Sequence, residues 1–178
     1  MKLDYSLYST DKNTKHSYME VYEEIFSKYD YPVDLLEIGV ETGGSLKMWK
    51  DFFREGSNIC GIDNWSAPCL SKSKFNEKNV EGYRVYNGDA RVYQIDEKFD
   101  IIIDDGSHVL EDVILGIKNF WWNLKDEKKS IYIIEDIPGK KITESVEEIK
   151  NRTKLEVEVI DRRHVKDRYD DVMFILSK

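Results

Sequence analysis

The apolar positions of this chain fall into short runs, separated by stripes at helical spacing. Three consecutive isoleucines at 101–103 stand between aspartates, and a second apolar run covers 131–134. Such runs are typical of strands that are buried on both faces, as in a parallel sheet. Similar runs predict further strands at 33–38, 58–62, 82–86, 155–160 and 172–176.

Stripes of apolar residues three and four positions apart predict the helices. The clearest stripe runs from 110 to 124, and others cover 18–29, 46–53 and 142–149. Ser17, followed by Glu20 three residues later, has the form of a capping box and predicts the start of the first helix. We expect the aromatic stripe of this first helix to be core packing.

Strands and helices alternate five times, which predicts an α/β sandwich with a mostly parallel, seven-stranded sheet. A short charged segment, 161–171, separates the last two strands, so we expect them to form a C-terminal antiparallel hairpin. The polar segment 64–81 is expected to be a loop with a short helix. With 178 residues the chain is long enough for one full core, and we expect a single domain over 1–178.

Charge and composition narrow the function. A net charge of -8 argues against a general nucleic-acid binder, since phosphate contacts need clustered Lys and Arg. No apolar stretch approaches the roughly 20 residues that span a bilayer, and the opening residues lack a signal-peptide core. Two cysteines, Cys60 and Cys69, fit a reducing compartment. We therefore expect a cytoplasmic protein without a membrane partner.

The first strand leads into a glycine-bearing turn, Glu37-Ile38-Gly39-Val40-Glu41-Thr42-Gly43-Gly44-Ser45. Glycines let the backbone approach a ligand, and the following helix offers free N–H groups. Asp63 ends the second strand 24 residues after Gly39, the place of an acid that binds ribose hydroxyls. Asp89 follows the third strand and could accept from a base amine. Ordinary strand-end turns are the alternative.

The glycine spacing does not favour NAD. The pattern is E-x-G-x-x-x-G-G rather than G-x-G-x-x-G, and the acid Glu37 lies inside the strand. An anionic pyrophosphate gains nothing from Glu37 or Glu41, whereas a ligand with an ammonium or sulfonium group does.

Acidic residues also follow the fourth and fifth strands. Asp104-Asp105-Gly106-Ser107-His108 follows one, and Glu135-Asp136 follows the other. If these strands are neighbours, the carboxylates converge and repel one another unless a cation lies between them. Oxygen ligands suit Mg²⁺, Ca²⁺ or Mn²⁺. The alternatives are that His108 is a helix N-cap and that Glu135-Asp136 forms salt bridges near Lys140 and Lys141.

The motif at 37–45 resembles the first motif of class I S-adenosylmethionine-dependent methyltransferases. Asp63 and Gly88-Asp89-Ala90 match the ribose and adenine motifs of that superfamily, and the C-terminal hairpin resembles its reversed seventh strand. The segments 104–108 and 135–136 resemble more narrowly the macrocin-type sugar O-methyltransferases, which use Mg²⁺. Cephalosporin hydroxylase-like sequences share this pattern.

The resemblance implies a Rossmann-like class I methyltransferase that methylates a hydroxyl of a small acceptor, a sugar or another natural product. It assigns His108 as the general base. It assigns Mg²⁺, or another hard divalent cation, to Asp105, Glu135 and Asp136. It assigns S-adenosylmethionine to Glu37, Gly39, Gly43, Ser45, Asp63, Asn64, Asp89, Ala90 and Asp104.

The N-terminal loop and helix, residues 1–32, are expected to cover this site. Lys12 and His16 either lie over the cofactor or are ordinary loop charges. The chain has no long lid, so a homo-oligomer in which a second subunit completes the acceptor pocket is expected as one arrangement. Two other functions stay open: a module that binds S-adenosylmethionine without methyl transfer, and an oxidative or hydrolytic enzyme on the same scaffold.

Overall fold

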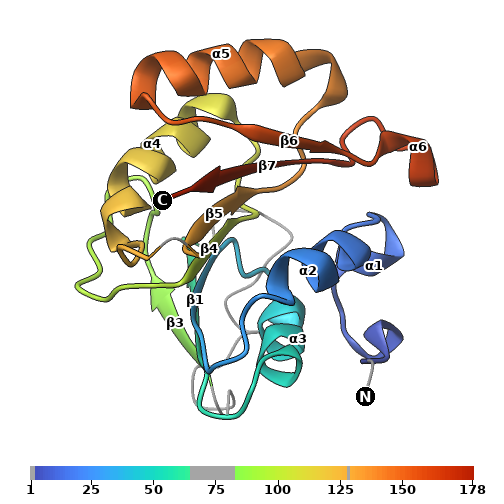
Figure 1. The fold of residues 1–178 in the computed structure, drawn as a ribbon, viewed down its shortest axis with the longest axis vertical. Helices are drawn as coiled ribbons and strands as arrows, with labels where there is room; N and C mark the ends of the chain where they lie inside the picture. Colours follow the sequence, from blue (N-terminus) through green and yellow to red (C-terminus); the bar gives the residue numbers. More distant parts are fainter. Residues whose placement is uncertain (1–2, 65–82, 128) are drawn as a thin grey trace.

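The computed structural model describes residues 3–64, 83–127 and 129–178. Its centre is a seven-stranded sheet in the order β3-β2-β1-β4-β5-β7-β6 (Figure 1). The strands are β1 Asp34–Ile38, β2 Asn58–Asp63, β3 Tyr83–Asn87, β4 Ile101–Asp104, β5 Ile131–Ile134, β6 Glu158–Asp161 and β7 Val172–Ser177. Neighbours from β3 to β5 are parallel, while β7 runs antiparallel to both β5 and β6. The predicted mostly parallel sheet with a reversed C-terminal hairpin is confirmed.

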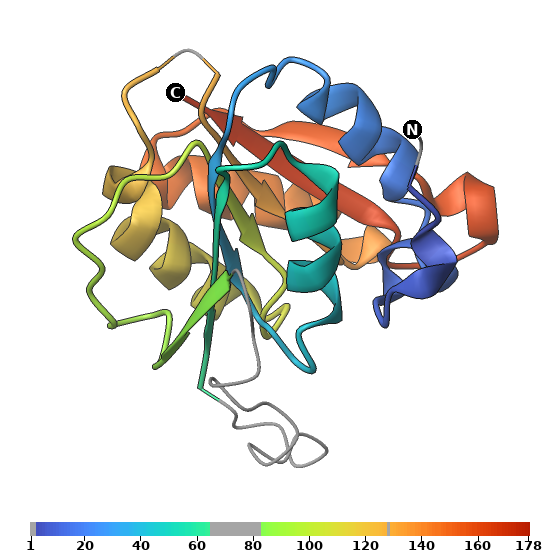
Figure 2. The ribbon, with the colours of Figure 1, turned by 90° about the horizontal axis from the view of Figure 1, so that it is seen from below.

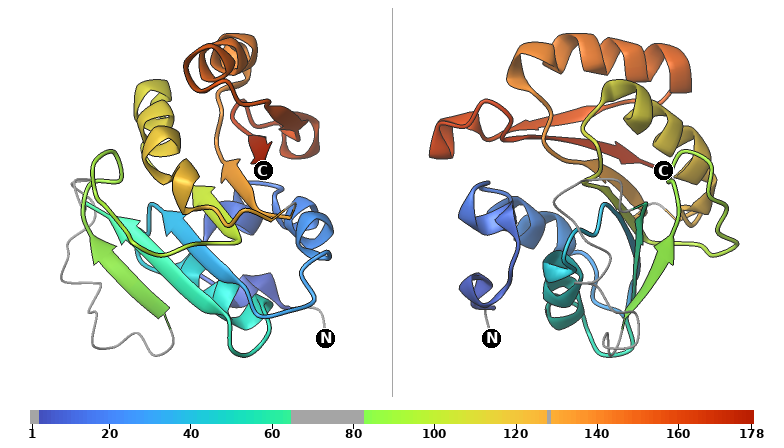
Figure 3. Two further views of the ribbon diagram at one scale, coloured as in Figure 1. Left: turned by 60° about the vertical axis from the view of Figure 1, so that its left-hand side comes forward. Right: turned by 180° about the vertical axis from the view of Figure 1, so that it is seen from behind.

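Helices cover both faces of the sheet (Figures 1 and 3). One layer holds α2 (Met19–Phe26) and α3 (Gly44–Phe52), and the other holds α4 (Leu110–Phe120) and α5 (Ile142–Thr153). Successive strand residues point to opposite faces, so odd-numbered residues of β1, β4 and β5 pack toward α2 and α3, and even-numbered residues pack toward α4. This alternation fixes where each acid beyond a strand points.

The α2–α3 layer is held by aromatic contacts. The ring centres of Tyr22 and Trp49 are 4.9 Å apart, and those of Phe26 and Trp49 are 5.7 Å apart. Figure 2 shows the two helices on the same side of the sheet. Edge-on pairs of this kind add to the burial of large apolar surface. The aromatic stripe of the first predicted helix is therefore core.

Short helical elements lie in the N-terminal segment, after α4, before α5 and between β6 and β7. These are the 3-10 turn η1 (Tyr5–Leu7), α1 (Asp11–Thr14), η4 (Trp121–Asn123), η5 (Gly139–Lys141) and α6 (Arg163–Lys166). In the described part of the chain, no helix has the length and apolar character needed to cross a membrane.

Two predicted boundaries were wrong. Ser17 does not cap α2, because its backbone N–H and its hydroxyl both donate to Asp171, the residue before β7, and the helix begins at Met19. The sixth strand begins at Glu158, not at 155, because Leu155 and Val157 pack against the core below α4 and α5 before the chain pairs with β7.

Other expected elements differ in smaller ways. The helix expected over 110–124 ends at Phe120 and continues as the 3-10 turn η4. The third strand is described from Tyr83, and the polar segment expected at 64–81 falls, after Asn64, outside the described residues, as does Cys69. Cys60 is a buried free thiol on β2.

Candidate active site

A cavity of about 640 Å³ opens at the carboxyl ends of the parallel strands. This is the edge at which open α/β sheets bind their ligands. Most of the predicted site residues line it, namely Gly39, Ser45, Asp63, Asn64, Asp89, Ala90, Asp104, Asp105, His108 and Asp136. Gly43, Glu37 and Glu135 are not among its lining residues. The cavity therefore joins both halves of the predicted site, one beyond β1–β3 and one beyond β4–β5.

The turn after β1 is shaped by glycine and by Asp63. Gly39 has a φ of +89°, and a Cβ at this position would lie 2.1 Å from the backbone oxygen of Asp105. Only glycine lets β1 pass the β4 loop so closely. One oxygen of Asp63, Oδ2, accepts the N–H groups of Val40 and Glu41 at 2.9 and 3.1 Å. Asp63 thus fixes the turn from the neighbouring strand end.

Glu37 lies behind this turn, not in the cavity. It shares the face of Leu35, so it points toward α3, where Ser45 Oγ donates to it at 2.6 Å and Trp49 Nε1 at 3.3 Å. Burial raises the pKa of this fully buried carboxyl, and a nearby ammonium, Lys12, opposes the shift. Glu37 therefore anchors the start of α3.

The other predicted cofactor acids already have partners in the protein. Asp89 accepts from Arg91, whose guanidinium also reaches Asp112 at 3.0 Å. Asp104 points to the α4 face, where the Tyr132 hydroxyl donates to it at 2.9 Å. Burial raises the pKa of Asp104 to about 6. Both acids line the cavity, and each already accepts a hydrogen bond from a protein side chain.

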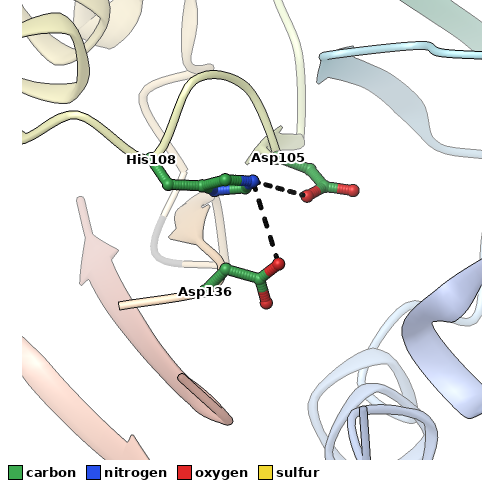
Figure 4. Close-up of side chains that lie close together, drawn as sticks. All are labelled: Asp105, His108 and Asp136. Atoms are coloured by element: carbon green, nitrogen blue, oxygen red, sulfur yellow. Dashed lines mark ion pairs between the residues drawn. The ribbon is translucent and has the colours of Figure 1, made fainter. Parts of the chain in front are cut away.

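Three side chains meet at the far end of the cavity (Figure 4). His108 Nε2 lies 4.0 Å from Asp105 Oδ1 and 3.8 Å from Asp136 Oδ2. The ligand atoms of these three residues all lie within 4.8 Å of one another. His108 and Asp136 both have left-handed backbones, with φ of 55° and 58°. Such conformations cost energy and are concentrated at functional sites.

The helix N-cap of α4 is Val109, so His108 is not the cap. Its side chain is 37% exposed, which leaves it open to a ligand in the cavity. Burial raises the pKa of Asp136, and the neighbouring Asp105 raises it further. A cation would remove this repulsion, and the two carboxylates can hold one beside His108.

Glu135 has a different surrounding. Its Oε2 accepts from Lys12 Nζ at 2.8 Å, and its Oε1 accepts from the Tyr22 hydroxyl. Lys12 is fully buried and also contacts Asp105 Oδ2 at 2.6 Å and Glu37 Oε1 at 3.3 Å. Burial raises the pKa of Glu135, and the Lys12 ammonium opposes that shift. Glu135 thus pairs with Lys12 instead of Lys140 or Lys141.

The N-terminal segment also supports Asp136. The Tyr18 hydroxyl donates to Asp136 Oδ1 at 2.7 Å, and His16 Nδ1 lies 3.2 Å from the same oxygen. The rings of His16 and Tyr18 are stacked with their centres 4.8 Å apart. Residues 12–22 thereby contribute four polar side chains to the acids beyond β4 and β5.

Sequence reasoning missed most of this support. Lys12 and His16 appeared only as candidates to lie over a cofactor, and Tyr18 and Tyr22 appeared only as core. The available signal was the hydroxyl of each tyrosine, because a buried tyrosine hydroxyl requires a hydrogen-bond partner and the strand ends offer acids. Lys12 carried no local signal, because its partners lie 93 and 123 residues further along the chain.

Known proteins similar to this chain were found by sequence and by structure. No protein-family profile matches it. It is 31% identical over 142 residues to an 8-demethyl-8-alpha-L-rhamnosyl tetracenomycin-C 2'-O-methyltransferase of Streptomyces olivaceus. The matched region is 73% of this chain and 35% of the relative. It is 31% identical over 145 residues to the demethylmacrocin O-methyltransferase of Streptomyces fradiae, which covers 74% of this chain and 35% of the relative. The chain thus spans about a third of the length of these curated relatives.

One solved structure has the same fold over the whole chain. It is the MycE methyltransferase from the mycinamycin biosynthetic pathway in complex with Mg and SAH. The TM-score is 0.68 at 22% sequence identity, and the match covers 100% of this chain and 55% of the other.

Proposed function

The chain is homologous to the macrocin-type sugar O-methyltransferases and has the class I methyltransferase fold, and on that premise we propose that it methylates a hydroxyl of a sugar-like acceptor. The methyl donor is S-adenosylmethionine, and a hard divalent cation assists. The resemblance seen in the sequence motifs is confirmed by these relatives; the activity of this chain is our proposal.

One observation carries the proposal. The cavity that holds the glycine turn, Asp63 and Asp89 is the same cavity that holds His108 and Asp136. A methyl donor bound beyond β1–β3 and an acceptor hydroxyl bound beyond β4–β5 would therefore lie in one continuous cavity and could come into contact. Holding two reactants in contact is the main contribution that such a site makes to methyl transfer.

For the cofactor half, the chain offers a backbone turn and strand-end acids. We assign the cofactor to Gly39, Gly43, Ser45, Asp63, Asn64, Asp89, Ala90 and Asp104, with Glu37 holding the turn from behind. The glycine turn exposes backbone to the cavity, and its shape is set by the two Asp63 contacts. Asp89, which is paired with Arg91, would contact the nucleoside end of the bound cofactor. The buried Asp104 would contact its amino-acid end.

For the other half, we assign the cation to Asp105 and Asp136, whose oxygens face each other across His108. The third carboxylate of the sequence prediction, Glu135, already has two protein partners. When bound, S-adenosylmethionine supplies the methyl group and a hard divalent cation lowers the pKa of a hydroxyl. Two converging carboxylates and oxygen-rich surroundings fit such a cation.

His108 is the proposed general base. Its Nε2 faces the cavity between the two carboxylates, and a neutral imidazole at this atom accepts the proton that the acceptor hydroxyl gives up. The nearby carboxylates stabilise the imidazolium that results. The side chain is exposed enough to reach a hydroxyl.

The names of the relatives support a sugar-bearing natural product as the acceptor, since they are O-methyltransferases of rhamnosyl tetracenomycin and of demethylmacrocin. We also propose that the chain forms a homo-oligomer in which a second subunit completes the acceptor pocket. A cytoplasmic location, expected from the sequence, is part of the same proposal. A module that only binds S-adenosylmethionine is disfavoured, because it would have no use for His108 and its acids.

The test is a calorimetric titration with S-adenosylhomocysteine, with and without Mg²⁺, followed by a methyl-transfer assay on sugar-bearing acceptors. His108→Ala should keep the affinity for S-adenosylhomocysteine and lower turnover by about 10²–10⁴-fold, the usual contribution of a general base. His164→Ala, which changes an exposed histidine on α6, is the matched control and should leave both quantities unchanged. Unchanged turnover in His108→Ala would exclude the base, and heat from NADH alone would exclude the methyltransferase.

A further inference from the structure

Among residues 3–64, 83–127 and 129–178, Lys12 is the only lysine whose side chain is fully buried. Lysines are almost never buried completely unless they are paired. Its ammonium contacts Asp105 Oδ2, Glu135 Oε2 and Glu37 Oε1 at 2.6, 2.8 and 3.3 Å. One positive charge therefore lies among three carboxylates, at the edge of the proposed active site.

The sheet explains why these three acids share one cation. Glu37, Asp105 and Glu135 are odd-numbered residues at the ends of three adjacent strands, β1, β4 and β5, so they point to the same face. Ile38, Asp104 and Ile134 are level with one another in the register, so Asp105 and Glu135 lie side by side. The segment that carries Lys12 crosses this face.

The carboxylate of Asp105 is divided between two neighbours. Its Oδ2 contacts Lys12, while its Oδ1 points to His108 and Asp136. Glu135 is not divided in this way, because both of its oxygens accept from buried protein groups, Lys12 and Tyr22. The exposed fraction of the Glu135 side chain is 2%, compared with 21% for Asp105 and 14% for Asp136.

We propose that Lys12 is a resident cation of the active site, which holds Glu135 away from the divalent cation and leaves that cation to Asp105 and Asp136. Lys12 is then a positioning residue: it fixes one Asp105 oxygen so that the other faces His108. The inference rests on the proposed function, because it assumes that a divalent cation binds at this end of the cavity.

The charge balance gives the expected direction of a test. Glu37, Asp105, Glu135 and Asp136 would carry four negative charges if all were ionised, and Lys12 offsets one of them. Lys12→Met removes that offset and frees Glu135 to act as a further ligand. A group that only supported the fold would, when lost, leave cation affinity unchanged or weaken it.

The experiment measures the Kd for Mn²⁺ by calorimetry on the full chain, for wild type, Lys12→Met and Lys15→Met, with circular dichroism to verify folding. We expect Lys12→Met to bind Mn²⁺ about tenfold more tightly, since a unit charge a few ångströms away is removed. Lys15→Met should match wild type, because Lys15 is exposed and its ion pair with Asp11, at 3.5 Å, lies on the surface. An unchanged or larger Kd in folded Lys12→Met would overturn the proposal.

Crystals of the wild type soaked with Mn²⁺ give a second test that does not depend on the variant folding. The anomalous peak should lie between Asp105 and Asp136, with Lys12 still paired to Glu135. A peak bonded to Glu135, with Lys12 displaced, would overturn the inference and leave the proposed function standing. If wild type binds no Mn²⁺ in either measurement, the cation step of the proposed function fails and this inference fails with it.

Discussion

The two halves of the cavity are built in different ways. The half beyond β1–β3 is made of backbone: a glycine turn held by Asp63 through two N–H contacts, with its helix start anchored by Glu37. The half beyond β4–β5 is made of carboxylates that repel one another, and Lys12, about 100 residues earlier in the chain, offsets part of their charge. The first half is held by hydrogen bonds to a backbone turn, and the second by ion pairs between residues far apart in the chain.

This difference determines how each half should respond to substitution. A backbone turn fails when its geometry is blocked, and the damage stays near the turn. An ionic cluster fails when one charge is removed, because the remaining charges are left buried without a partner. The ionic half should therefore show the larger loss of stability for the smaller change in shape.

The largest expected effect is the loss of Lys12. Lys12→Met keeps most of the side-chain volume but leaves Glu37 and Glu135 buried without their cation, so the free energy of unfolding should fall by about 3–5 kcal/mol. Urea unfolding at neutral pH in the presence of EDTA measures it. Lys15→Met, three residues along the same segment, should show no measurable change. A loss no greater than that of a surface substitution would mean that the acids of this half do not depend on a distant charge.

A backbone change in the other half should cost less. Gly39→Ala places a Cβ 2.1 Å from the backbone oxygen of Asp105, and alanine is also strained at a φ of +89°. We expect a loss of about 2–3 kcal/mol in the free energy of unfolding, within the range for backbone strain, together with weaker binding of S-adenosylhomocysteine.

Gly56→Ala is the matched control for that substitution. Gly56 has a φ of +91°, but a Cβ there would only touch the Pro32 ring at 3.5 Å. It should therefore show the cost of the left-handed conformation alone, about 1–2 kcal/mol, and leave ligand binding unchanged. If the free energy of unfolding fell equally in the two variants, the close contact between β1 and the loop after β4 would not contribute to stability.

The same contrast decides what could be predicted from the sequence. The turn at 37–45 could be identified because its residues are consecutive, and because glycine indicates a left-handed backbone or a close approach of the chain. The convergence of Asp105 and Asp136 could be inferred because neighbouring parallel strands end at one edge. The alternation of strand side chains also separates Glu37 and Glu135, on one face, from Asp104, on the other, but only once the register of β1, β4 and β5 is known.

The remaining contacts could not be inferred. Lys12 is one of three lysines in the polar segment 1–16, and nothing near it in the chain indicates burial. The capping box predicted at Ser17 does not form, because the N–H and the hydroxyl of Ser17 both donate to Asp171, which is distant in the chain. Local rules predicted the backbone half of the site, whereas the ionic half depends on contacts that form only when the chain has folded.

The smallest expected effect lies at the anchor of the local half. Ser45 Oγ donates to Glu37 at 2.6 Å, and Ser45→Ala removes that hydrogen bond while Trp49 and Lys12 still contact the carboxylate. Because two partners remain, we expect a loss of about 1–2 kcal/mol in the free energy of unfolding, near the lower end for a hydrogen bond to a charged group. Ser107→Ala removes two exposed hydrogen bonds, one to Asp112 and one from the Val109 N–H, and should leave stability unchanged. If Ser45→Ala were as damaging as Lys12→Met, Glu37 would depend on its local partner more than on the distant ammonium, and the division between a local half and an ionic half would fail at the residue that belongs to both.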